Sequence, residues 1–123
     1  MARFLLVAGA LALALAVAMG ALSAHAVRSA AHPDAARLLQ TAVLYQFVHG
    51  LGLVAIGILA RASASRWLVA AGSFLLVGIL AFCGGLYLLA FIGASLGPLV
   101  TLGGTAFIVG WLNLAAFALV EKR

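Results

Sequence analysis

The chain has 123 residues, of which 67% are hydrophobic and only 7% are charged. Soluble domains carry about 25% charged residues, so this composition excludes an ordinary water-soluble domain. The net charge of +5 comes from basic residues scattered at the ends of apolar segments. Because no basic stripe with interleaved aromatic residues exists, nucleic acid is not an expected partner.

Four apolar segments nearly fill the chain, and each approaches the roughly 20 residues that a helix needs to cross a bilayer. Lipid offers the backbone no hydrogen bonds, so each segment must be helical. The sequence therefore predicts an all-α integral membrane four-helix bundle that forms a single transmembrane domain over residues 1–123. The helices are expected at about 4–24, 33–60, 67–91 and 99–120.

The first expected helix, 4–24, has features of a secretory signal peptide. Arg3 precedes the apolar run, and the segment Ser23–Ala26 offers a cleavage site of the A-x-A type. The run is longer than the roughly 7–15 apolar residues of a typical signal peptide. We therefore interpret it as a first transmembrane helix, followed by a polar loop that begins at His25.

The second expected helix, 33–60, has the most unusual pattern in the chain. Pro33 suits a first helical turn and Asp34 complements the positive end of the helix dipole, so the helix is expected to begin near Pro33. Polar residues then recur at spacings of three and four, with Gln46 beside them. This polar stripe consists of Asp34, Arg37, Thr41, Tyr45 and His49. Because polar groups are unfavourable in lipid, we expect the stripe to face the bundle interior.

The last two expected helices, 67–91 and 99–120, begin at recognisable signals. Trp67 follows Arg66, as expected of an aromatic and basic anchor at a membrane interface, and Pro98 is expected to start the final helix. The single cysteine, Cys83, is expected to be a buried, small apolar side chain. The 14 glycines are expected to allow close approach of the helices.

The distribution of basic residues predicts the orientation of the bundle. With four spans, both termini and the loop at 61–66 lie on one side of the membrane. Five of the seven Lys and Arg residues belong to that side, namely Arg3, Arg61, Arg66, Lys122 and Arg123, against Arg28 and Arg37 on the other. The positive-inside rule therefore predicts that both termini are cytoplasmic.

The polar residues allow several kinds of site, which differ in how well the sequence supports them. His25, His32 and His49 could ligate a metal or haem, but His49 is expected about 12 Å deeper than His25 and no His-x-x-x-His pair occurs. No metal or other cofactor is therefore expected. The two acids, Asp34 and Glu121, lie near opposite interfaces, and no nucleophile has a base at motif spacing, so no catalytic residues and no enzymatic activity are expected.

Two functions remain for the polar interior. Tyr45, Gln46, His49 and Asn113 could be interhelical hydrogen-bonding groups of a structural, assembly or accessory subunit, which is the favoured hypothesis. The alternative is an oligomeric transporter or channel for small solutes or ions that uses the polar stripe, because a buried ionisable residue such as His49 can mark a pathway. His49 and Asn113 differ by about 9 Å in expected depth, so a path through one protomer would need further polar groups.

Several motifs resemble those of one known family. The motifs are Gly20-Ala-Leu-Ser-Ala-His25-Ala, Thr41-Ala-Val-Leu-Tyr45-Gln46-Phe-Val-His49, Gly84-Gly85-Leu-Tyr87-Leu-Leu-Ala90, Leu96-Gly97-Pro98-Leu-Val-Thr101-Leu-Gly103-Gly104 and Gly110-Trp111-Leu112. In order and spacing they resemble the YgdD-like family of small bacterial inner-membrane proteins, to which animal transmembrane protein 256 is similar. The resemblance implies four transmembrane helices and a multi-pass location in the bacterial inner membrane. It implies no established activity, and the expected partners are the lipid bilayer and a larger membrane complex or further copies of the chain.

Overall fold

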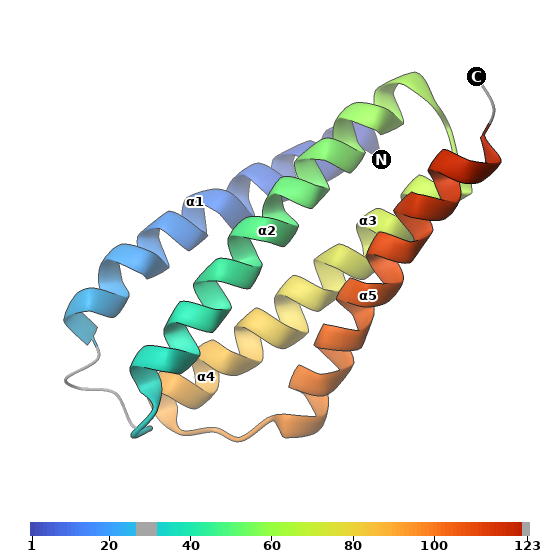
Figure 1. Cartoon of the computed structure of the whole chain (residues 1–123). Coiled ribbons are helices and arrows are strands. Elements are labelled where there is room, and N and C mark those ends of the chain that lie inside the picture. The colour runs from blue at the N-terminus through green and yellow to red at the C-terminus, as the bar shows by residue number, and fades with distance from the viewer. Residues whose placement is uncertain (27–31, 122–123) are drawn as a thin grey trace.

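The computed structural model describes residues 1–26 and 32–121, and within these residues four long helical spans form a bundle. The elements are α1 (Ala2–Ala26), α2 (Ala35–Ala62), α3 (Arg66–Gly78), α4 (Gly84–Ile92) and α5 (Gly97–Val120). α3 and α4 are joined by a π-helical turn, Ile79–Cys83, and together make one continuous span. The expected all-α membrane architecture is therefore confirmed, with α1 beside α2 and α3 beside α5 (Figure 1).

The helix ends follow from local hydrogen bonds, and they lie within two residues of the predicted bounds. α2 begins at Ala35 rather than near Pro33, because Pro33 and Asp34 lie in a turn in which the Ala35 amide donates to the His32 carbonyl at 3.1 Å. α4 ends at Ile92 and is capped by Gly93, whose φ of 70° is left-handed and suits a residue without a side chain. Pro98 lies in the first turn of α5, as expected.

The π-helical turn was not predicted, because hydrophobic periodicity does not distinguish it from an α-helix. Its residues belong to one apolar run, in which Ile79, Ala81 and Cys83 are buried. α5 crosses this turn at close range: a Cβ on Gly103 would lie 2.5 Å from the backbone nitrogen of Phe82. Close packing of small residues between membrane helices is confirmed at this crossing.

The outer surface of the bundle carries many large apolar side chains. Leu80, Leu102 and Leu119 are 69%, 65% and 83% exposed, whereas core residues such as Leu53 and Leu75 are fully buried. A water-soluble protein rarely exposes so much contiguous apolar surface, so these side chains face lipid. The first residues of α1 and the last residues of α5 lie at the same end of the bundle (Figure 1), which we name the terminal end. That this end is cytoplasmic stays a prediction.

Candidate functional site

Gln46 lies at the centre of a polar network that joins three helices. Its side chain is only 4% exposed, and its amide nitrogen donates to the Ala12 carbonyl of α1 at 2.8 Å. Its amide oxygen accepts a hydrogen bond from the Tyr87 hydroxyl of α4 at 2.6 Å. Both ends of the amide are therefore used in interhelical bonds, and α2 is tied to α1 on one side and to α4 on the other.

His49 lies one turn further along α2, between aromatic rings. Its ring is stacked on Phe107 of α5, with ring centroids 3.5 Å apart and planes inclined by 14°. Nδ1 lies 2.6 Å from the Tyr45 carbonyl oxygen of the same helix. Because a carbonyl oxygen can only accept, Nδ1 must carry a proton. In the part of the chain that the structure describes, Nε2 has no hydrogen-bond partner.

The rings around His49 form what we name the aromatic cluster. Its members are Tyr45 and His49 of α2, Phe82 of the π-helical turn, and Phe107 and Trp111 of α5. Tyr45 and Trp111 remain 39% and 38% exposed, so the cluster reaches the surface of the bundle. Aromatic side chains thus fill the space between α2 and α5 from the interior outward.

The polar stripe of α2 does not face the interior along its whole length. Asp34 and Arg37 are both exposed and form an ion pair at 3.3 Å within the first turn, where it contributes little to stability. His25 is also exposed, at the last turn of α1. The inward orientation applies to His49 and to Gln46, which the spacing had placed beside the stripe, whereas Tyr45 is partly exposed.

Asn113 does not make the expected interhelical hydrogen bond. Its amide nitrogen donates to the Val109 carbonyl at 2.8 Å, four residues earlier in α5. The side chain is half-buried and is satisfied by its own helix. His49 likewise bonds within its own helix, so Gln46 alone among the four predicted groups has interhelical partners in the described structure.

Sequence reasoning did not assign a site role to Tyr87, Phe82 or Phe107. Tyr87 carries a signal that could have identified it, namely a phenol in an apolar helix that needs a partner for its hydroxyl group. The two phenylalanines are indistinguishable in sequence from lipid-facing residues. The Ala12 carbonyl could not be predicted either, because a backbone acceptor becomes available only through the crossing of α1 and α2.

No group of three or more metal-ligating side chains comes together among residues 1–26 and 32–121. Cys83 is a free, buried thiol in the π-helical turn, as expected from its apolar surroundings. His25 is exposed at the last turn of α1, whereas His49 is buried in α2.

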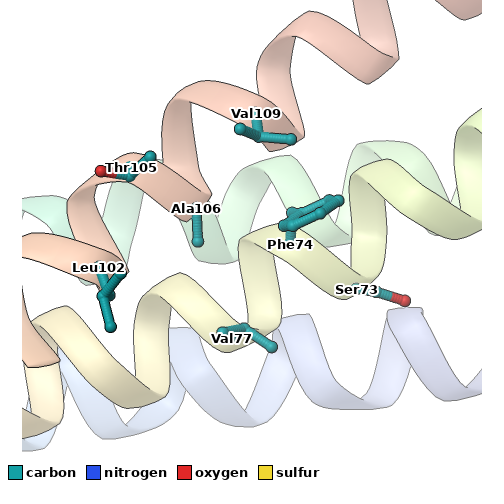
Figure 2. A pocket seen from close by; sticks show the side chains of 7 residues that line it. All are labelled: Ser73, Phe74, Val77, Leu102, Thr105, Ala106 and Val109. Atoms are coloured by element: carbon teal, nitrogen blue, oxygen red, sulfur yellow. The ribbon is translucent and has the colours of Figure 1, made fainter.

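A cavity of about 350 Å³ lies between α3 and α5 (Figure 2). It is lined by Ser73, Phe74, Val77, Leu102, Thr105, Ala106 and Val109. The Thr105 hydroxyl donates to the Thr101 carbonyl at 3.1 Å, and the other lining groups, apart from Ser73, are apolar. Ligand sites usually contain several convergent polar groups, so this cavity has the character of a lipid-facing depression.

At the terminal end of the bundle, a polar contact joins the loop after α2 to the end of α5. The Ser63 hydroxyl donates to Oε2 of Glu121 at 2.6 Å. Hydrogen bonds from Ser63, the larger contribution, and from Ser65 hold the pKa of the Glu121 carboxyl below its ordinary value. Glu121 is therefore a stable negative charge beside the membrane-spanning part of α5.

Comparison with known proteins assigns the chain to a family. A family model described as protein of unknown function, DUF423, matches residues 19–104. The UPF0382 membrane protein SSP2132 of Staphylococcus saprophyticus is 36% identical over 115 residues, covering 91% of this chain and 93% of the relative. The UPF0382 membrane protein YwdK of Bacillus subtilis is 33% identical, covering 94% and 96% of the two chains. The UPF0382 inner membrane protein YgdD of Escherichia coli is 31% identical, covering 98% and 93%.

No solved structure matches the chain. The relatives named above are membrane proteins, and the apolar surface of the bundle agrees with a multi-pass location in the inner membrane. The resemblance seen in the sequence motifs is thus confirmed over nearly the whole chain, and this protein belongs to the DUF423 family of UPF0382 membrane proteins.

Proposed function

We propose that this chain is a non-enzymatic structural, assembly or accessory subunit of the inner membrane. The observation that carries the proposal is the use of Gln46, whose amide nitrogen and amide oxygen each make a hydrogen bond that holds α2 to another helix, α1 or α4. Interhelical hydrogen bonds in membranes contribute about 0.5–2 kcal/mol each and favour one packing over others. A polar group used in this way is a structural element rather than a group held ready for a substrate.

The outer faces of the bundle support a role in association with other membrane proteins. In the most apolar stretch of α1 and of α5, 22% of the residues are buried, compared with 44% in α2 and in the α3–α4 span. α1 and α5 therefore offer long apolar faces on which helices of a partner could pack. Such packing would add helices to the bundle without rearranging its core.

The alternative hypothesis, an oligomeric transporter or channel for small solutes or ions, is supported by one observation. The Tyr45 side chain is 39% exposed, and its hydroxyl group has no hydrogen-bond partner among the described residues. An exposed polar group in lipid is unfavourable. A second copy of the chain packed over Tyr45 would cover it and bring two polar stripes together.

Two measurements separate these hypotheses. Gentle detergent extraction followed by mass determination should recover the chain with a stoichiometric partner of different sequence if it is an accessory subunit. Proteoliposomes that contain the chain alone should show no more solute or ion flux than empty liposomes. Flux that is lost in the variant Tyr45→Phe, together with a symmetric homo-oligomer, would contradict the proposal and support the alternative.

His49→Ala provides the matched stability measurement. Removal of a buried ring that is stacked on Phe107 should lower the thermal stability of the bundle in detergent. Under the favoured hypothesis, the amount of partner that co-purifies should fall only in proportion to the loss of thermal stability of the bundle. A variant that keeps its thermal stability but abolishes a reproducible flux would instead show that His49 acts in transport.

A further inference from the structure

α2 and α5 enclose a cleft of about 880 Å³ at the terminal end of the bundle. One wall is formed by Leu59 and Ala62 of α2, and the opposite wall by Leu114, Phe117 and Ala118 of α5. Its volume lies within the range of about 300–1,000 Å³ that is usual for ligand sites. Toward the membrane centre, the aromatic cluster occupies the space between the same two helices.

The cleft is apolar inside and polar at its mouth. From Leu114 to Glu121 its α5 wall runs about 10 Å along the helix axis. The mouth is marked by Ser63 and by Glu121, which are joined by a 2.6 Å hydrogen bond. Oε2 of Glu121 accepts from Ser63, and the lowered pKa of this carboxyl keeps it ionised at neutral pH. An apolar chain could therefore lie in the cleft with a cationic hydrogen-bond donor at its outer end.

The mouth of the cleft lies at the level of the lipid headgroups. Trp67 starts α3 at this end, and the Arg66 guanidinium lies 5.4 Å from the centre of its ring. An indole beside an arginine is typical of the membrane interface. Arg61, in the last turn of α2, and Arg66 are both exposed at this level. The cleft thus has one carboxylate at its mouth, while the terminal end also carries the guanidinium groups of Arg3, Arg61 and Arg66.

We propose that this cleft binds a zwitterionic phospholipid with a primary amine, such as phosphatidylethanolamine. One acyl chain lies between the apolar walls of α2 and α5, the ammonium group donates a hydrogen bond to Glu121, and the phosphate faces the arginine side chains of this end. The other acid of the chain, Asp34, belongs to the opposite end and is paired with Arg37, so it does not compete for the headgroup.

Charge and hydrogen bonding distinguish this lipid from others in the bilayer. The headgroup of an anionic lipid such as phosphatidylglycerol has no cation for Glu121. Phosphatidylcholine carries a positive charge, but its quaternary nitrogen has no N–H group to donate. The inference is independent of the proposed accessory role.

The test uses the full chain in nanodiscs that contain equal amounts of phosphatidylethanolamine, phosphatidylcholine and phosphatidylglycerol with identical acyl chains. Native mass spectrometry after release from the nanodiscs measures which lipid stays bound. We expect one molecule of phosphatidylethanolamine to be retained about three- to tenfold more often than phosphatidylcholine, as one charge-assisted hydrogen bond at an exposed site allows. Equal retention of all three lipids, or preferential retention of phosphatidylglycerol, would overturn the proposal.

Two variants locate the bound lipid. Glu121→Gln keeps the size of the side chain but removes its charge, so the preference over phosphatidylcholine should fall close to unity. Ala118→Phe should fill the cleft and abolish retention, whereas Ala115→Phe places the same side chain on an exposed position of α5 outside the cleft. Loss of lipid in both phenylalanine variants, or in neither, would contradict the assignment. The other contrary result is that a second copy of the chain is retained by the unsubstituted protein and by Ala115→Phe but not by Ala118→Phe. That result would show that protein rather than lipid occupies the cleft.

Discussion

α2 packs against α1 and against α5 in different ways. Against α1 the backbones touch: a Cβ on Gly9 would lie 2.9 Å from the Gly50 carbonyl oxygen and 2.9 Å from the Val54 nitrogen. Against α5 the space is filled by side chains, with the His49 ring stacked on Phe107, and it widens into a cleft of about 880 Å³. The contact between α1 and α2, which we name the α1–α2 seam, is closed by small residues and cannot admit a ligand. The contact between α2 and α5, the α2–α5 seam, is formed by side chains that can adapt their conformation.

The difference follows from what holds helices together in lipid. Apolar side chains gain little from leaving a hydrocarbon solvent, so close backbone contact and hydrogen bonds stabilise the pair. The α1–α2 seam has both, through its glycines and through the bond from Gln46 to the Ala12 carbonyl. The α2–α5 seam relies on ring stacking within the bundle and on the Ser63–Glu121 contact at its end.

The largest effect is expected from Gly9→Ala in the close α1–α2 seam. The new methyl group would meet backbone atoms that cannot rotate away, so the helices must separate, at a loss of about 1–3 kcal/mol in the free energy of unfolding. Reversible unfolding in mixed micelles measures this loss. Gly20→Ala is the matched control in the same helix, because its methyl group would lie 3.7 Å from Val43 and should be tolerated. Equal losses in the two variants would show that the seam is not defined by backbone contact.

A smaller loss is expected from Gln46→Leu, which removes both interhelical hydrogen bonds while keeping an apolar side chain of similar size. The free energy of unfolding should fall by about 1–2 kcal/mol. Tyr87→Phe removes only the bond to α4 and should show roughly half of this effect. If Tyr87→Phe were as damaging as Gln46→Leu, the bond to the Ala12 carbonyl would contribute nothing.

His49→Phe should lower the free energy of unfolding by less than Gln46→Leu does, because a phenyl ring can replace the imidazole on Phe107. The Tyr45 carbonyl loses a side-chain donor but keeps its place in the helix. Thermal unfolding of His49→Phe and of Gln46→Leu, measured side by side, compares the contribution of the imidazole in the α2–α5 seam with that of the central amide. A loss as large as that of Gln46→Leu would show that the imidazole nitrogens have a structural role.

The smallest effect concerns the ionisation of Glu121. Its pKa is lowered by hydrogen bonds that favour the charged form. Their contribution to the stability of the folded chain is therefore present above the ordinary pKa of 4.5 and is lost as the pH falls through the lowered pKa. Ser63→Ala should raise the pKa of Glu121 toward its ordinary value, as followed by the carboxyl carbon signal in NMR. An unchanged titration in this variant would show that Ser63 does not stabilise the carboxylate.

The sequence predicted the number and type of the spans, because long apolar segments in lipid have a single solution for their backbone hydrogen bonds. It also predicted Gln46 and His49 as notable polar groups in α2, although it placed Gln46 beside the stripe rather than at the centre of the network. Their partners could not be predicted from sequence. They depend on the crossing geometry that brings the Ala12 carbonyl and Phe107 into contact with α2.

Other features could not be predicted from the sequence pattern, each for a different reason. Asn113 was expected to reach another helix, but its amide donates to a carbonyl four residues earlier in α5. The cleft at the terminal end is lined by residues of α2 and α5 that lie far apart in the chain, so no single segment encodes it. The orientation of the bundle in the membrane stays a prediction that rests on the distribution of lysine and arginine.

The π-helical turn Ile79–Cys83 sets the rotational phase between α3 and α4. A π-helical turn accommodates one residue more than an α-helical turn, and one residue of an α-helix corresponds to a rotation of about 100°. Deletion of the exposed Leu80 would therefore let the span continue as a regular α-helix with nearly the same rotational phase after it, and Tyr87 would keep its place beside Gln46. Without the π-helical turn, the same residues in a regular α-helix would turn α4 by about 100° and carry Tyr87 away from Gln46. A chain of this family could thus lose one codon from this turn and still keep its central phenol–amide bond.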